Sequence, residues 1–305
     1  MSTTGGGAVT APTGEVASTN DDEQLSARVR FFRHPETAVV TTAASMFAML
    51  ILGGLLSALM YMAFARITGH TAEGTWRTII MVASYGCIAG FAVLLILLWR
   101  KLARVPLRGL GLAPSRRLWL LIPGFALAIG VNYAVAGIAV TAGAAEWSSE
   151  QPVLLAYPTL LSIVVIFFGQ AFPEELLWRG HLAGLLRLRM GTRGIIITTS
   201  LGFGVLHILS GSNAQNFGDQ LIYVVQAIAL GCLLIAMRLG ASSLWLAVGF
   251  HTGYNVFFDV VAPMPGSYWV EILTRVIVLA ILATIALLAW LKLRQRPSAF
   301  ARRPK

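Results

Sequence analysis

The stretch AFPEELLWRG, residues 171–180, places two carboxylates and a guanidinium inside a strongly apolar region. It follows LLSIVVIFFGQ (160–170) and precedes HLAGLLRL (181–188). A run of about 20 mostly apolar residues is long enough to cross a bilayer as one helix. Glu174, Glu175 and Arg179 would then lie at membrane depth, where ionisable side chains are costly and usually mark a functional site.

The composition of the whole chain is that of a membrane protein. Of its 305 residues, 57% are hydrophobic and only 12% are charged, whereas soluble domains contain about 25% charged residues. The net charge is +10, but the basic residues flank apolar runs and do not cluster with exposed aromatic residues, as a nucleic-acid-binding surface requires. We therefore expect the lipid bilayer as a partner and no nucleic acid. Cys87 and Cys232 lie in apolar runs without paired spacing, so no disulfide is expected.

The hydropathy pattern predicts an all-α fold, a polytopic bundle of eight transmembrane helices around a buried polar cavity. Residues 1–27 are polar and rich in Gly and Thr, which predicts a disordered cytoplasmic tail, and residues 28–305 form the membrane domain. The basic linker 100–118 is expected at the membrane surface. The eight predicted spans cover residues 38–65, 78–99, 118–142, 153–178, 194–210, 219–237, 242–261 and 269–291.

The basic residues orient this bundle. Of the 23 Lys and Arg residues, 19 fall on one side of the eight predicted spans. Cytoplasmic loops of membrane proteins carry an excess of Lys and Arg. We therefore expect a multi-pass protein of the plasma membrane with both termini in the cytoplasm.

Three of the spans carry polar side chains at a common depth. Glu174, His207 and His251 each lie 13 or 14 positions from the arginine at the basic end of their span. At 1.5 Å per residue, each is about 20 Å from that end. The sequence therefore predicts that one acid and two imidazoles meet in a single layer of the bundle.

The helical phase adds detail to this layer. Glu175 and Arg179 are spaced i, i+4, with the acid first, as in a stabilising ion pair. Pro173 cannot donate a backbone hydrogen bond and is expected to bend its helix just before the carboxylates. His251 and Asn255, also spaced i, i+4, share one face of the seventh span.

A carboxylate, two imidazoles and a carboxamide in one buried layer can hydrolyse an acyl bond in two ways. A glutamate and a histidine can deprotonate water, while the other imidazole and the amide stabilise an oxyanion. Alternatively, Glu174, His207 and His251 could hold Zn²⁺ and leave a coordination position for water. The residues alone leave both arrangements open.

Three motifs carry a resemblance to a known family. EELLWR (174–179), FGVLH (203–207) and HTGYN (251–255) fit the patterns EExxxR, FxxxH and HxxxN in order, each on its own span. The sequence resembles the CPBP group of intramembrane proteases, which includes CAAX prenyl endopeptidases of the Ras-converting type and lysostaphin-resistance-protein-A-like proteins. The resemblance covers residues 120–260, which we take as the catalytic core.

The resemblance implies a glutamate-dependent endopeptidase that cuts a peptide bond near the membrane surface, of the CAAX type or a bacteriocin- or peptide-processing type. It implies that Glu174 activates water with His207, and that His251 and Asn255 bind the oxyanion. The substrate would be a peptide or protein, prenylated or not. No cofactor is required in this arrangement, and zinc stays as the alternative.

The same resemblance gives supporting roles to neighbouring residues. Glu175 and Arg179 would brace the site, and Phe203 would form cavity wall or ordinary packing. His181 is expected at the membrane interface. Gln170 and Gln226 are expected to form hydrogen bonds between helices.

Two other classes of function fit the buried charges. A non-catalytic membrane immunity or scaffold protein would use them only for structure. A proton-coupled transporter would use buried Glu, His and Arg residues as a proton relay. Transporters often contain internal repeats, and no repeat is evident in this sequence.

Overall fold

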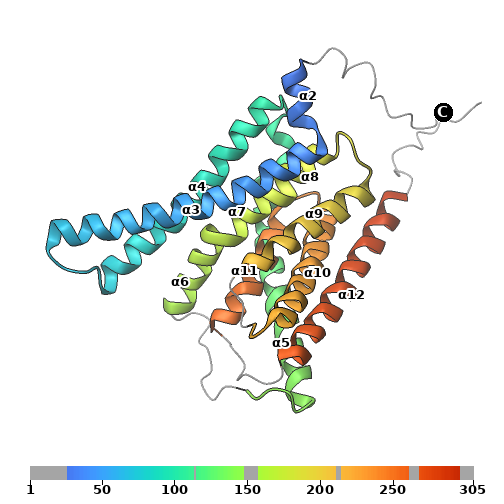
Figure 1. Cartoon of the computed structure of the whole chain (residues 1–305). Coiled ribbons are helices and arrows are strands. Elements are labelled where there is room, and N and C mark those ends of the chain that lie inside the picture. Colours follow the sequence, from blue (N-terminus) through green and yellow to red (C-terminus); the bar gives the residue numbers. More distant parts are fainter. Residues whose placement is uncertain (1–25, 113–114, 148–156, 211–213, 261–267, 296–305) are drawn as a thin grey trace, which may run out of the picture.

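The computed structural model describes residues 26–112, 115–147, 157–210, 214–260 and 268–295. Every regular element in these ranges is a helix, and they contain no strand, which confirms the all-α prediction (Figure 1). The tail predicted to be disordered lies almost entirely outside the described residues.

The helices follow the predicted spans closely. The elements, in chain order, are α2 (Ala27–Arg33), α3 (Pro35–Thr68), α4 (Gly74–Leu102), η1 (Leu107–Leu110), η2 (Ser115–Leu120), α5 (Leu121–Thr141), α6 (Tyr157–Ile166), η3 (Phe167–Ala171), α7 (Phe172–Glu175), η4 (Leu176–Leu182), α8 (Ala183–Leu186), α9 (Thr192–Leu206), η5 (His207–Leu209), α10 (Phe217–Ala241), α11 (Trp245–Val260) and α12 (Tyr268–Gln295).

Seven helical stretches of the described chain are long and apolar enough to cross a membrane. The predicted span 242–261 corresponds to α11, which is shorter, with 16 residues. At 1.5 Å per residue it reaches about 24 Å, most of the ~30 Å hydrocarbon core of a bilayer. The chain is therefore a multi-pass membrane protein, and eight crossings remain compatible with its helices.

The helices form a bundle with one hairpin set apart. α10 packs against α9 and α12, and α11 packs against α5. α3 and α4 lie side by side, and the end of their hairpin leans away from the other helices (Figure 1). Residues of the hairpin and of the other helices line one cavity, and Glu174 and His207 belong to its wall.

Residues 157–186 form one continuous helical stretch with two wider turns. Pro173 lacks the N–H group that a regular α-helix would use, and its ring would clash with the carbonyl group four residues earlier. The π-helical turn η3 lies directly before it, with the N–H of Phe172 bonded to the carbonyl of Phe167, and the π-helical turn η4 follows the carboxylates. The irregularity expected at Pro173 thus takes the form of π-turns, which often occur at functional sites.

Glycines allow close contact between the helices that carry the polar layer. A Cβ atom built on Gly249 would lie 2.2 Å from the carbonyl oxygen of Leu121, and one on Gly253 would lie 2.7 Å from that of Phe125. α11 therefore rests directly on the backbone of α5. Because backbone cannot swing aside like a side chain, only glycine fits at these positions.

We expect Gly249→Ala to destabilise the protein by about 1–3 kcal/mol, since the added methyl group overlaps the backbone of α5. Gly137→Ala on α5 is the matched control, because a Cβ atom there meets nothing within 4 Å. Thermal unfolding of both variants in detergent should show a lower melting temperature for Gly249→Ala only. Equal melting temperatures would contradict the close contact.

Candidate active site

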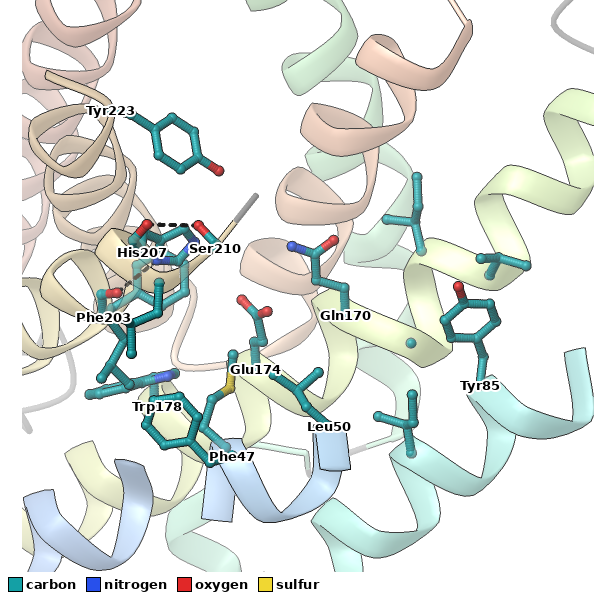
Figure 2. A pocket seen from close by; sticks show the side chains of 17 residues that line it. Phe47, Leu50, Tyr85, Gln170, Glu174, Trp178, Phe203, His207, Ser210 and Tyr223 are labelled. Atoms are coloured by element: carbon teal, nitrogen blue, oxygen red, sulfur yellow. Dashed lines mark hydrogen bonds between the residues drawn. The ribbon is translucent and has the colours of Figure 1, made fainter. Parts of the chain in front are cut away.

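Glu174 lies on the wall of a cavity of about 520 Å³ between the α3–α4 hairpin and the bundle. The residue is only 4% exposed. Figure 2 shows the side chains of Glu174, Gln170 and His207 around the same space. Apolar residues form most of the remaining wall, among them Met46, Phe47, Leu50, Ile88, Val165, Ile166, Leu206 and Leu209.

His207 is held in one tautomer by the end of its helix. α9 ends at Leu206, and the imidazole Nδ1 lies 2.8 Å from the carbonyl oxygen of Phe203. A carbonyl oxygen only accepts hydrogen bonds, so Nδ1 carries the proton and Nε2 is left with a lone pair. The cavity therefore holds two proton acceptors, the carboxylate of Glu174 and Nε2 of His207.

The backbone around His207 is fixed by two further hydrogen bonds. Gln220 Nε2 and Ser210 Oγ each donate to the carbonyl oxygen of His207 at 2.8 Å. These bonds satisfy a carbonyl that the helix end would leave free. They hold the imidazole at the cavity wall.

His251 lies next to Glu174 but is not among the residues that line the cavity. Its Nε2 atom is 3.9 Å from Oε2 of Glu174, and its side chain is nearly fully buried. Its Nδ1 atom lies 3.0 Å from Oε1 of Glu175. A carboxylate accepts this bond, so Nδ1 donates and Nε2 faces Glu174.

Glu175 and Arg179 form the expected ion pair, with 2.7 Å between Arg179 Nη1 and Glu175 Oε1 and no exposure of either side chain. The same Oε1 atom accepts the bond from His251. Arg179 Nη2 also donates to the carbonyl oxygen of Gly231 on α10 at 3.4 Å. The pair therefore ties three helical segments together.

The aromatic ring of Phe203 lies close to the guanidinium of Arg179 and to both imidazole rings. The Arg179 guanidinium carbon lies 4.2 Å from the ring centroid, close enough for a cation–π contact. The ring centroids of His207 and His251 are 4.6 Å and 5.9 Å away, respectively. Phe203 is both packed, at 1% exposure, and part of the cavity wall.

Asn255 stands apart from this group. It lies one turn after His251 on α11, is partly exposed, and is not among the residues that line the cavity. Of the residues predicted from sequence, Glu174, Phe203 and His207 line the cavity, and His251 lies 3.9 Å from Glu174. Neither His251 nor Asn255 is among the lining residues.

Two polar residues at the cavity carried no sequence signal. Tyr223 on α10 and Ser210 after η5 both line it, and the Tyr223 hydroxyl points into the open space (Figure 2). The ring of Tyr223 lies 5.9 Å from that of His207. A single tyrosine in an apolar helix is common at packing positions, so its sequence context does not reveal it.

His181 is fully buried within the protein, and neither of its ring nitrogens has a hydrogen-bond partner. It lies seven positions after Glu174, on nearly the same helical face. Its depth at the membrane interface stays a prediction. Gln226, in contrast, forms the interhelical bond expected of it, to the hydroxyl of Tyr254 at 2.9 Å.

The residues present do not fit the zinc alternative. Zinc ligands lie about 2.0–2.2 Å from the metal and converge on one point. Within the part of the chain that the structure describes, no three His, Cys, Asp or Glu side chains are grouped in this way.

A comparison with known protein families gives a match for the segment that carries the candidate site. Residues 156–257 match the family model of the type II CAAX prenyl endopeptidase Rce1-like proteins. No curated protein matches the chain. The matched segment is about one third of the chain and contains every candidate site residue predicted from the sequence. The resemblance seen in the three motifs is thus confirmed: the segment that carries the polar layer is similar to the Rce1-like family of CAAX-type membrane proteases.

Proposed function

We propose that the protein is an intramembrane endopeptidase in which Glu174 activates a water molecule to hydrolyse a peptide bond near the membrane surface. The observation that carries this proposal is the position of the Glu174 carboxylate, in a cavity of about 520 Å³ and 3.9 Å from an imidazole. The match of this segment to a family of CAAX-type proteases supports it.

Glu174 and His207 suit the activation of water. A water molecule in the cavity can donate one hydrogen bond to the carboxylate and one to Nε2 of His207. Glu174 then takes a proton as the water oxygen attacks the carbonyl carbon, and later gives that proton to the leaving amine.

The oxyanion formed in this attack needs hydrogen-bond donors on its own side. Nε2 of His251 faces Glu174 and donates when the imidazole carries both protons. Asn255 keeps the donor role that the resemblance implies. We add Tyr223 as a donor, because its hydroxyl points into the cavity while Asn255 does not line it.

The cavity wall favours an apolar substrate segment. α3 contributes Met46, Phe47 and Leu50, and Phe47 and Leu50 are themselves 37% and 45% exposed. An aliphatic peptide end, prenylated or not, would bury against this wall. The distribution of basic residues further supports a plasma-membrane protein with cytoplasmic termini.

The variants Glu174→Gln, His207→Ala and His251→Ala are each expected to lower peptide hydrolysis by about 100- to 10,000-fold, since each removes a group that handles a proton or the oxyanion. The assay uses the protein in liposomes and a library of quenched peptides with CAAX ends, with and without a farnesyl group. Product masses then locate the cleaved bond.

The controls for these variants are Glu73→Gln and His70→Ala, which change exposed residues of the loop between α3 and α4. Both should keep full activity. Undiminished hydrolysis by any of the three site variants would refute the mechanism. Proton uptake into liposomes without hydrolysis would identify a transporter instead, and a phenotype in cells that survives Glu174→Gln would identify a non-catalytic partner protein.

Tyr223→Phe should lower kcat about 10- to 100-fold with little change in KM, because it removes a donor used mainly in the transition state. Tyr133→Phe on α5 is the matched control, since Tyr133 does not line the cavity. Steady-state kinetics on the best peptide of the library measure both. An unchanged kcat in Tyr223→Phe would remove this residue from the mechanism.

Dialysis against EDTA should leave the rate of hydrolysis unchanged, because no three His, Cys, Asp or Glu side chains of the described residues are grouped as metal ligands. The measurement is the rate before and after dialysis, with metal analysis of the same samples. A loss of activity that added Zn²⁺ restores would contradict this expectation.

A further inference from the structure

A second hollow lies away from the cavity, where α4 ends and the linker to α5 begins. It is a shallow groove of about 600 Å³. Residues of both kinds line it: the apolar Leu97, Val105, Pro106 and Leu107, and the basic Arg100, Lys101 and Arg104. We propose that this groove binds the phosphate-bearing headgroup of an anionic phospholipid of the surrounding bilayer.

The positive charge of the groove favours binding of an anion. None of the described residues that line it is acidic. Lys101 and Arg104 are exposed, and neither forms an ion pair with a carboxylate in the described part of the chain. Arg33 of α2 adds a further positive charge beside the groove, donating to the carbonyl oxygens of Ala103 at 2.9 Å and Arg104 at 3.1 Å.

Arg100 provides an independent observation. Its side chain is only 1% exposed, and its Nη2 group donates to the carbonyl oxygen of Pro106. Its Nε and Nη1 groups are buried and have no hydrogen-bond partner. A buried guanidinium with unpaired donors is costly unless a counter-charge is near. A phosphate group held in the groove by Lys101 and Arg104 would supply that charge.

The apolar part of the groove distinguishes a lipid from a free phosphate ion. Leu97 and Leu107 are 42% and 51% exposed. They flank the basic residues at the end of a helix long enough to cross the membrane. A phospholipid presents a charged headgroup next to apolar chains, as this surface requires, and basic pockets at the cytoplasmic ends of transmembrane helices commonly bind such headgroups.

Occupation of the groove would also stabilise the helix that carries the candidate site. A Cβ atom on Gly109 of η1 would lie 2.9 Å from Arg100 Nη2, and one on Gly184 of α8 would lie 3.2 Å from Arg100 Nη1. The guanidinium is therefore enclosed between the linker and the stretch 157–186. An anion in the groove would offset the charge that is buried between these two segments.

The test measures binding to the purified full chain in an uncharged detergent. The probes are dioctanoyl phosphatidylglycerol, dioctanoyl phosphatidylcholine and inorganic phosphate. The anionic lipid should bind and raise the melting temperature. Phosphatidylcholine should bind at least about tenfold more weakly, and inorganic phosphate should leave the melting temperature unchanged. Equal binding of the two lipids, or an equal effect of free phosphate, would overturn the proposal.

The double variant Lys101→Gln/Arg104→Gln should weaken binding of phosphatidylglycerol about tenfold or more, since both basic side chains attract an anionic headgroup. Arg108→Gln is the control, because Arg108 is exposed on η1 and does not line the groove. It should bind as the unaltered protein does. Binding by the double variant that equals the control refutes the site, whatever the outcome of the protease assay. These exposed residues are used because Arg100→Gln could impair folding.

Discussion

One carboxylate oxygen holds the polar layer together. Oε1 of Glu175 accepts hydrogen bonds from Arg179, one helical turn away, and from His251 on α11. All three groups are buried, so removing one of them would leave a buried charge without its partner. Such a loss typically lowers the free energy of unfolding by about 3–5 kcal/mol. The same oxygen fixes the ring of His251 so that Nε2 faces Glu174. In our proposal the Glu175–Arg179 ion pair takes no part in the hydrolysis itself. It orients His251 toward Glu174.

Most of the helices and the depth of the polar side chains could be predicted from the sequence, because a bilayer restricts the structures that a chain can adopt. Backbone groups in a bilayer must bond within their own helix, so long apolar runs predict the helices α3, α4, α10 and α12 to within four residues at each end. Basic residues at the span ends then give the depth of each polar side chain. That is why Glu174 and His251, 77 positions apart in the chain, could be expected to meet.

The remainder depends on features that periodicity cannot express. His181 lies seven positions after Glu174 and so on nearly the same helical face, but periodicity does not show that neighbouring segments cover it completely. Tyr223 reaches the cavity only through the way α10 packs on α9, which no motif encodes. The basic groove combines α4 with the linker, and its charges look in sequence like ordinary residues at the end of a span.

The wide turns around Pro173 also bear on chain length. A π-turn holds one residue more than the α-turn it replaces. Removing one residue from Phe167–Ala171 could restore a regular helix on both sides, yet every later side chain would rotate by about 100°. Glu174 would then leave the cavity wall, and Glu175 would no longer reach α11. The number of residues in Phe167–Ala171 therefore sets the direction of the side chains that follow. A substitution in this segment should be tolerated more easily than a deletion.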